Sequence, residues 1–268
     1  MQKKILITGS TDGIGLETAK MMTEAGHKVL LHGRSYVKLE AARETLVALS
    51  GGVKVDGYIA DLSRFNDIAE LANSIARDYE TLDVLINNAG VFKTPNPIAE
   101  NGLDVRFMVN TIAPHILTAL LLPLLGRSGR IVSLSSAAQS PVNLKALTGR
   151  SRLNDIDAYS QSKLALTMWS AEMARSHEDG PVFIAVNPGS LLASKMVKEG
   201  FGIAGNDIGI GASILSRLSI EEDYAPDSGK YFDNDRGRFG APHSDALDLE
   251  TSKAVVDTIK TVAANLTD

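Results

Sequence analysis

The sequence predicts an α/β fold, a doubly wound parallel sheet with helices on both faces, and three observations support this. Short apolar runs rich in β-branched residues alternate with longer helical runs along most of the chain. Strands joined in this way lie parallel, because each crossover must be long and right-handed. A glycine-rich turn follows the first strand directly, and 44% of the 268 residues are hydrophobic, enough to bury a large core. We expect a single domain over residues 1–268.

The glycine-rich turn lies between an apolar strand at residues 4–8 and a helix that begins near residue 16. The amino end of a helix carries unpaired N–H groups and a partial positive charge, and a turn without side chains lets a pyrophosphate approach the backbone. We therefore expect a phosphate site within a doubly wound nucleotide-binding (Rossmann) fold, although three residues separate the first two glycines, a wider spacing than in the common dinucleotide fingerprint. The alternative is a turn whose glycines only serve left-handed backbone angles. The turn residues are Gly9, Ser10, Thr11, Asp12, Gly13, Ile14 and Gly15.

The remaining elements follow in alternation. Strands are expected at residues 28–32, 53–59, 82–86, 129–136 and 182–186, and helices at 37–49, 68–79, 101–125 and from 158 to about 174. Residues 137–157 show no clear period, and a last edge strand at 229–233 precedes a polar turn region and a terminal helix at about 249–265.

Residues 190–218 are rich in glycine, methionine and aliphatic side chains, among them Met196, Phe201, Ile203, Ile208 and Ile210. This composition favours a mobile helical substrate lid with an apolar lining. A packed helical excursion or a subunit contact explains the same composition.

The end of the second strand predicts the cofactor. An acidic residue there would hydrogen-bond an adenosine ribose, whereas an arginine pairs with a 2′-phosphate. Residues 32–35 contain no acid, and Arg34 stands among them. We expect NADP(H), with Arg34 as the main discriminator. The alternative is a solvated loop arginine.

Two further strand ends should face the same crevice, because ligands of an open α/β sheet bind at the carboxyl ends of its strands. Asp61-Leu62 follows the third strand, and Asn87-Asn88-Ala89-Gly90 closes the fourth. A purely structural role at these strand ends is the alternative, since Asn and Asp favour such turns.

Composition argues against several classes of protein. The net charge is −5 and there is no basic run, so nucleic acid and anionic membranes are poor partners. There is no cysteine, and the five histidines have no ligand spacing, so we expect no metal site. A strand from about residue 3 leaves no room for a targeting segment, and the apolar stretch 116–125 is too short to span a bilayer, so we expect a cytoplasmic protein. Trp169 is expected in the core or an interface.

Six motifs occur in the order found in the short-chain dehydrogenase/reductase family, which the chain resembles over residues 3 to about 190. They are Thr8-Gly9-x-x-x-Gly13-x-Gly15, Asn-Asn-Ala-Gly at 87–90, Asn110, Ser136, Tyr159-x-x-x-Lys163 and Asn187-Pro188-Gly189. The spacing of 23 residues between Ser136 and Tyr159 is longer than is common in the family and resembles that of its retinol-dehydrogenase-like branch.

The resemblance implies cofactor contacts along the chain. Asp61 and Leu62 would flank the adenine, Asn88, Ala89 and Gly90 would lie along the cofactor, and Pro188 and Gly189 would turn over the nicotinamide. The threonine that the family often places soon afterwards is missing, since Ala193 and Ser194 stand there.

Reduction of a carbonyl by hydride leaves an alkoxide that needs a proton. Tyr159 can donate it, and the Lys163 ammonium one turn away, together with the positive nicotinamide, would lower the phenol pKa by stabilising the phenolate. Ser136 would hydrogen-bond the substrate oxygen, although Ser135 is an alternative, because neighbouring strand residues face opposite ways. Asn110, by resemblance, holds a water that connects Lys163 to solvent.

Each of the four catalytic candidates also has a structural interpretation. Ser136 could be a cap, Asn110 a helix-bend hydrogen bond, Tyr159 a core edge and Lys163 an exposed charge. Their joint order favours an NADP(H)-dependent oxidoreductase that interconverts a small-molecule ketone or aldehyde and an alcohol. A catalytically silent NADP-binding sensor is the main alternative, and an epimerase or dehydratase a weaker one. Apolar faces of helices 101–125 and 158–174 favour a homodimer or homotetramer.

Overall fold

In the computed structural model, which describes residues 1–193, 202 and 204–267, the strands form one sheet of order β3-β2-β1-β4-β5-β6-β7-β8. Neighbouring strands are parallel from β3 to β7, and β8 is antiparallel to β7. The chain reverses its direction of travel across the sheet between β1 and β4, which opens a crevice at the carboxyl ends of these strands. The strands are β1 (Lys4–Ile7), β2 (Lys28–Gly33), β3 (Asp56–Ile59), β4 (Val84–Asn87), β5 (Arg130–Leu134), β6 (Val182–Asn187), β7 (Tyr231–Asp233) and β8 (Arg238–Gly240).

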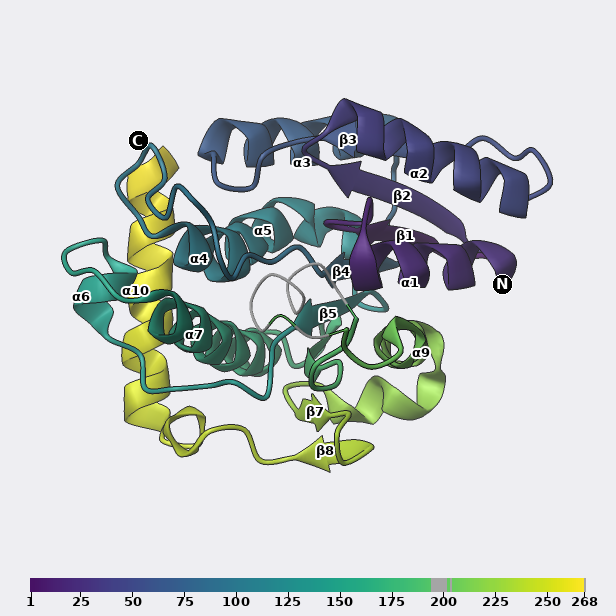
Figure 1. Cartoon of the computed structure of the whole chain (residues 1–268). Coiled ribbons are helices and arrows are strands. Elements are labelled where there is room, and N and C mark those ends of the chain that lie inside the picture. The colour runs from purple at the N-terminus through teal and green to yellow at the C-terminus, as the bar shows by residue number, and fades with distance from the viewer. Residues whose placement is uncertain (194–201, 203, 268) are drawn as a thin grey trace.

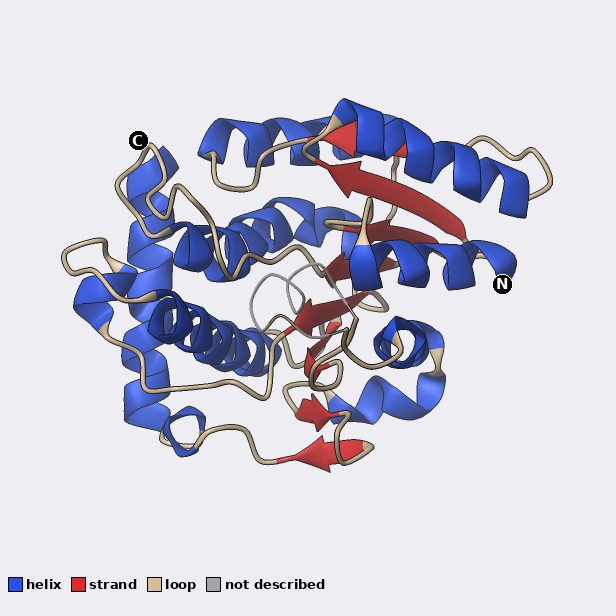
Figure 2. Ribbon diagram, in the orientation of Figure 1, coloured by secondary structure: helices blue, strands red, loops and turns tan. Residues whose placement is uncertain are grey.

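Helices cover both faces of the sheet (Figures 1 and 2). One face carries α1 (Gly13–Glu24), α2 (Tyr36–Leu49) and α9 (Ile208–Ile220). The other carries α3 (Phe65–Asp78), α5 (Ala113–Leu125) and α7 (Asp155–Ser176). The shorter elements are α4 (Val105–Phe107), the π-helix η1 (Met108–Ile112), α6 (Leu144–Leu147), and the 3-10 turns η2 (Glu222–Asp227) and η3 (Ser244–Ala246). The doubly wound α/β fold is confirmed.

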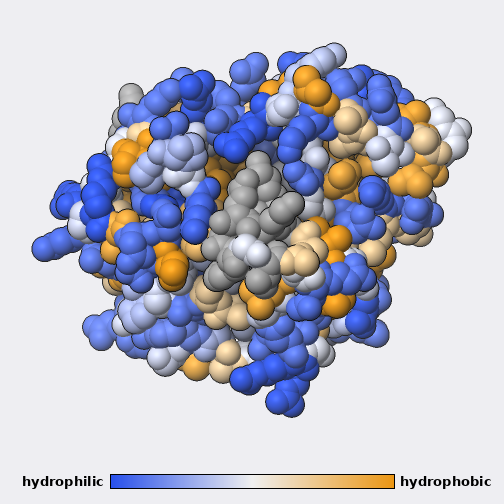
Figure 3. Space-filling view, viewed as in Figure 1, coloured by the Kyte–Doolittle hydropathy of each residue, from blue (hydrophilic) through white to orange (hydrophobic). Residues whose placement is uncertain are grey.

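The two faces of the sheet belong to two apolar cores, as strand alternation requires. On β1, Leu6 packs into the core under α3, α5 and α7, whereas Ile5 and Ile7 pack into the core under α1, α2 and α9. Trp169 on α7 is fully buried in the first core, as expected. Hydrophilic residues cover most of the face seen in Figure 3, with apolar residues in small groups among them.

The helical run from α4 through η1 to α5 is longer than the apolar stretch 116–125 from which the sequence excluded a membrane span. Among the described residues, Val105–Leu125 is the helical run long and apolar enough to cross a membrane by length and composition, and 67% of that window is buried inside the fold. The core helix of a folded domain passes the same test. Here the run lies in the first core, and its α5 part packs against α3.

The terminal helix α10 (Leu249–Thr267) lies across α7 and α5 (Figure 1). Val255, Val256 and Ile259 of α10 are buried in the same core as Leu117 of α5 and Trp169 of α7. The apolar faces that we expected to form a symmetric dimer are therefore covered in part by the chain's own last helix, while Leu120 of α5 stays exposed.

Two sequence predictions need correction. Residues 229–233 do not form an edge strand, because β8 pairs with β7 on its outer side. The region 137–157, expected to be irregular, contains α6. Within the expected lid segment, Ile208–Ile220 form α9, whose Ile214, Leu215 and Leu218 are buried in the second core, and the lid role stays a prediction. Ser194, Met196, Phe201 and Ile203 lie outside the described residues.

Candidate active site

The glycine-rich turn lies at the carboxyl end of β1 and leads directly into α1. Gly9 and Gly13 have φ angles of 65° and 57°, a region that side chains disfavour. A Cβ on Gly15 would lie 2.4 Å from the Asn88 amide nitrogen and 2.5 Å from the Gly9 carbonyl oxygen, so this position excludes any side chain. Asp12 caps α1 by accepting a hydrogen bond from the Gly13 N–H. The positive end of α1 therefore meets the crevice.

The other turn residues serve mainly to hold this shape. The Ser10 hydroxyl is buried and accepts a hydrogen bond from the His32 N–H at 2.9 Å. Thr11 packs against Gly33, where an added Cβ would lie 2.5 Å from the threonine methyl carbon. Ile14 packs against the second core. Asp12 also forms an ion pair with Lys38 of α2 at 2.7 Å.

The strand β4 ends against the glycine-rich turn. The Asn88 side chain donates hydrogen bonds to the carbonyl oxygens of Thr8 and Gly9, at 2.8 and 3.1 Å. The Thr8 hydroxyl accepts from the Asn88 and Ala89 N–H groups, both at 3.0 Å. A Cβ on Gly90 would lie 3.5 Å from both the Lys163 ammonium nitrogen and the Asn110 amide oxygen. This segment therefore connects the phosphate turn to the catalytic candidates.

Arg34 and Asp61 lie at the ends of the neighbouring strands β2 and β3. Arg34 is exposed. Burial works against the charge of Asp61, but hydrogen bonds from Ser63 and the positive charges of Arg34 and Arg64 hold its pKa below the usual value. The side chain of Leu62 is buried in the first core, so only its backbone can reach the crevice.

Tyr159 and Lys163 share one face of α7, four residues apart. The Lys163 ammonium nitrogen lies 5.6 Å from the centre of the Tyr159 ring and donates a hydrogen bond to the Leu134 carbonyl oxygen at 2.6 Å. Burial lowers the pKa of Lys163 to about 7.

Burial also raises the pKa of Tyr159, and a hydrogen bond with the Ser136 side chain opposes this rise. The sequence analysis expected Lys163 to lower the phenol pKa. For the protein alone the largest cause is burial, because desolvation disfavours the charged form of the phenol, and the lowering by Lys163 and the nicotinamide stays a prediction.

The two neighbouring serines at the end of β5 face different surroundings. The Ser135 hydroxyl is buried, donates to the Lys163 carbonyl oxygen at 3.1 Å and lies 2.6 Å from the Thr167 hydroxyl. Ser136 interacts with the Tyr159 side chain so as to lower its pKa, and its hydroxyl accepts from the Ala138 N–H at 3.1 Å. Ser136 is thus the serine placed beside the phenol.

Asn110 lies in the π-helix η1, and its side chain bridges two segments. Its oxygen accepts from the Val91 N–H at 2.8 Å, and its nitrogen donates to the Val91 carbonyl and the Ser162 hydroxyl, at 3.0 and 2.9 Å. Through these hydrogen bonds the Asn110 side chain joins the segment that follows β4 to α7. The water that the resemblance implied for Asn110 stays a prediction.

The turn that contains Pro188 and Gly189 follows β6 and is held by the β7–β8 hairpin. The Asp235 carboxylate accepts from the Ser190 N–H and from the Asn187 side chain, both at 2.8 Å, and from the Ser190 hydroxyl at 2.5 Å. Asn234 donates to the Pro188 carbonyl oxygen at 2.9 Å. The turn is therefore held by residues of the β7–β8 connection, which are distant from it in sequence.

Sequence reasoning missed several residues around this site. Nothing in the local sequence marked Asp235, because its partners lie 45 and 48 residues earlier. Phe92 packs edge-on against Tyr159, with ring centres 5.1 Å apart. Arg106 offered one signal, a charge within an otherwise apolar helical run. Among the described residues, no group of three or more His, Cys, Asp or Glu side chains could hold a metal ion.

Comparisons with known proteins match this architecture. A family model described as short chain dehydrogenase matches residues 3–201. Retinol dehydrogenase 13 from Homo sapiens is 31% identical over 263 residues, which cover 91% of this chain and 80% of that protein.

Two solved structures are similar over most of the chain. A protein from Mycobacterium paratuberculosis has a TM-score of 0.81 at 27% identity, covering 98% of this chain and 94% of that one. A short chain dehydrogenase from Escherichia coli, complexed with NADPH, has a TM-score of 0.72 at 26% identity and covers 87% of this chain and 96% of that one.

Proposed function

The chain belongs to the short-chain dehydrogenase/reductase family and to its retinol-dehydrogenase-like branch, and on that premise we propose that it is an NADP(H)-dependent oxidoreductase with Tyr159 as the proton-transfer residue. As a member of this family it is an alcohol/carbonyl oxidoreductase that uses a nicotinamide cofactor. The observation that carries the finer proposal is the cluster at the crevice, where the Ser136 side chain lowers the pKa of the Tyr159 phenol and the Lys163 ammonium nitrogen lies 5.6 Å from the centre of its ring.

The residues at the crevice fit a phosphorylated dinucleotide. The turn at Gly9 and Gly13 offers backbone N–H groups and the positive end of α1 to a pyrophosphate. Arg34 is exposed at the end of β2, where it would pair with a 2′-phosphate. Two similar structures are complexes with NADP and NADPH, which favours NADP(H) over NAD(H). Asp61, Asn88, Ala89, Gly90, Pro188 and Gly189 would line the rest of the site.

NADP(H), when bound, supplies or accepts the hydride. In carbonyl reduction, Tyr159 donates its hydroxyl proton to the substrate oxygen, while Ser136 donates a hydrogen bond to the same oxygen as negative charge develops on it. Because burial raises the pKa of Tyr159, the phenol holds its proton at neutral pH, as this donation requires. Lys163, held by the Leu134 carbonyl, lies where it can stabilise the phenolate that remains.

The substrate class that this site supports is a small molecule with a carbonyl or alcohol group. The segment at about 190–218 follows the Pro188-Gly189 turn, and its role as a lid within a single domain over 1–268 is part of this proposal. The cytoplasmic location and a homo-oligomeric state stay predictions of the sequence.

The experiment that tests the proposal is the substitution Tyr159→Phe, followed by loss of NADPH absorbance with a panel of aldehydes and ketones. We expect the variant to keep its affinity for NADPH and to lose turnover by about a hundredfold or more, because the proton donor is absent. Tyr58→Phe on β3, which removes a hydroxyl bonded to Asp78, is the matched control and should keep its rate. Full turnover in Tyr159→Phe contradicts the assignment.

A further inference from the structure

Arg106 places a buried positive charge beside the candidate active site. Its side chain is only 1% exposed, among the largest fully buried side chains of the described residues. Its guanidinium pairs with Asp104 through two bonds, Nη2 to Oδ2 at 2.6 Å and Nε to Oδ1 at 2.7 Å. Burial works against the charge, but the carboxylates of Asp104 and Asp155 outweigh it and raise the pKa of Arg106.

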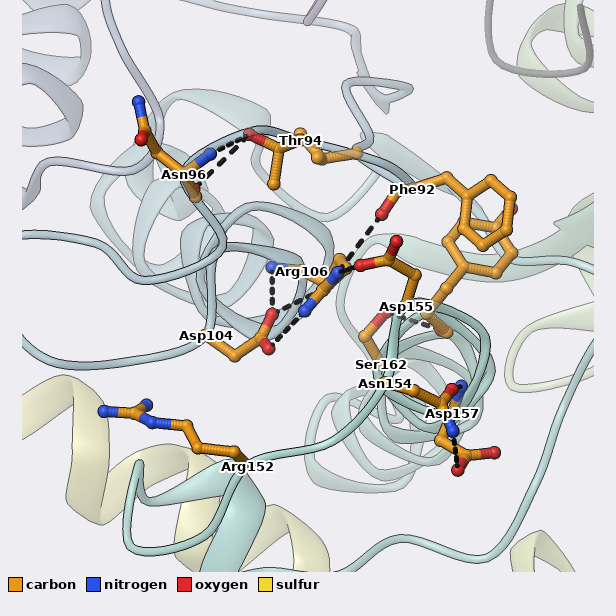
Figure 4. Close-up of polar contacts among 12 residues, drawn as sticks. Phe92, Thr94, Asn96, Asp104, Arg106, Arg152, Asn154, Asp155, Asp157 and Ser162 are labelled. Carbon is orange, nitrogen blue, oxygen red and sulfur yellow. Dashed lines mark hydrogen bonds and ion pairs between the residues drawn. The ribbon is translucent and has the colours of Figure 1, made fainter. Parts of the chain in front are cut away.

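The third nitrogen of the guanidinium reaches Asp155 and Phe92 (Figure 4). It donates to the carboxylate of Asp155, the first residue of α7, and to the Phe92 carbonyl oxygen at 3.5 Å. Asp155 lies one helical turn before Tyr159, and the Phe92 ring packs edge-on against the Tyr159 ring at an interplanar angle of 61°. Arg106 therefore contacts the first residue of α7 and the backbone of the residue whose ring packs on Tyr159.

A second tie joins the same segment to α7 on the other side of Tyr159. Thr111 donates to the Ser162 carbonyl at 2.8 Å, and Asn110 donates to the Ser162 hydroxyl at 2.9 Å. The Ser162 hydroxyl in turn donates to the Tyr159 carbonyl at 2.7 Å. Residues 155, 159 and 162 lie on one helical face, so Tyr159 stands between two ties to residues 104–111.

Stability alone does not explain the tie to Asp155. A buried arginine is costly to desolvate and is already paired with Asp104. The Asp155 side chain is 44% exposed, and an ion pair at such a position contributes little to folding. The tie does, however, fix the direction in which α7 begins, four residues before the phenol.

We propose that Arg106, acting through Asp155 and the Phe92 carbonyl, is a positioning residue that sets the orientation of the Tyr159 phenol toward Ser136. The inference rests on the proposed function, since it concerns the geometry of the same proton donor. It predicts that loosening the first turn of α7 lowers turnover and leaves cofactor binding intact.

The test uses Asp155→Ala in the full chain, because this change frees α7 while Arg106 keeps Asp104 as its partner. We expect kcat for carbonyl reduction to fall about tenfold, since small misplacements of a catalytic group are costly, with KM for NADPH unchanged. Asp155→Asn keeps an oxygen that can accept from Arg106 and should restore most of the rate.

Asp157→Ala is the matched control. It removes a carboxylate from the same turn of α7, so it reproduces any effect of charge near the helix N-terminus, but Asp157 bonds Asn154 and not Arg106. We expect it to keep the wild-type kcat. Equal losses in Asp155→Ala and Asp157→Ala would overturn the proposal, and so would a wild-type kcat in Asp155→Ala.

A second measurement is independent of turnover. In protein with carbon-13-labelled tyrosine rings, the Tyr159 signals are those that vanish in Tyr159→Phe. They should shift or broaden in Asp155→Ala and stay in place in Asp157→Ala. Unchanged Tyr159 signals in Asp155→Ala would overturn the inference whether or not the wild-type protein reduces a carbonyl. Absence of turnover in the wild-type protein would instead count against the proposed function.

Discussion

His32 is a buried residue near the end of β2 whose two ring nitrogens contact different backbone groups of the candidate cofactor site. Nδ1 accepts a hydrogen bond from the Gly9 N–H at 3.0 Å, so Nε2 carries the proton that faces the Ala60 carbonyl at 3.2 Å. Burial lowers the pKa of His32 from 6.5 to about 4, which keeps the ring neutral. A second proton, on Nδ1, would break the bond to the glycine-rich turn.

This arrangement predicts a pH effect with a defined sign. The unfolded chain takes up the His32 proton at about pH 6.5 and the folded chain only near pH 4, so the free energy of unfolding falls as the pH falls through this interval. His32→Leu should flatten that slope by up to about 1.4 kcal/mol per pH unit. It should also weaken NADPH binding about tenfold at neutral pH, because the Gly9 N–H loses its acceptor.

His115→Leu is the matched control for this prediction. Burial lowers its pKa to about 4 as well, but its ring accepts from Trp169, away from the cofactor turn. Urea unfolding between pH 4 and 7 should give a flatter slope for both variants, whereas NADPH titration should separate them. An unchanged NADPH affinity in His32→Leu would show that His32 does not hold the glycine-rich turn in its cofactor-binding shape.

For individual residues, the sequence predicted which side chains lie together but not how burial changes their pKa values. The motif residues Ser136, Tyr159 and Lys163 are side by side, as their order in the resemblance implied. The lowering of the Tyr159 pKa by Lys163 and the nicotinamide stays a prediction, and the burial that opposes it is not visible in a four-residue spacing. The choice between Ser135 and Ser136 needed the side-chain directions.

Among the secondary-structure elements, the strands and long helices were predictable because apolar periodicity reports burial directly. The exceptions are elements whose form depends on a partner. The π-helix η1 looks like ordinary helix in sequence, and its wide turn directs Asn110 toward Val91 and Ser162. Strand β8 has three residues, too few for a period, and exists through its pairing with β7.

The β7–β8 hairpin yields a prediction about the turn at Pro188 and Gly189. Burial works against the charge of Asp235, but hydrogen bonds from Ser190 and Asn187 hold its pKa below the usual value, so the carboxylate accepts these bonds at neutral pH. Asp235→Ala removes all three and should raise KM for NADPH by about three- to tenfold, the effect of one or two net hydrogen bonds.

The matched control for the hairpin is Asp227→Ala, which removes a carboxylate paired with Lys230 on the turn before β7. Steady-state kinetics with varied NADPH should show the change in KM for Asp235→Ala alone. If both variants bind NADPH as the wild type does, the hairpin does not position the turn.

On the scale of the whole molecule, the parallel sheet and its crevice followed from the alternation of strands and helices, because right-handed crossovers leave few arrangements. The location of α10 could not be predicted in the same way. Its apolar stripe predicts a buried face but names no partner, and the α5 and α7 faces that it covers were expected to meet a second copy of the chain. Amphipathic patterns in two segments are satisfied equally by packing within one chain or between two.

The packing of α10 predicts that no symmetric dimer forms through α5 and α7. Ile259→Ala, at a fully buried position of α10, should lower the free energy of unfolding by about 2–5 kcal/mol, as expected for truncation in a core. Because the contact lies within one chain, the Tm of both proteins should be independent of protein concentration, whereas a dimer interface makes Tm rise with concentration. Leu249→Ala, at an exposed position of the same helix, should leave Tm unchanged. Two results together would contradict the intramolecular packing and place a second copy on this face. They are a mass by light scattering of twice the 28.6 kDa chain mass, and a concentration dependence of Tm that Ile259→Ala abolishes.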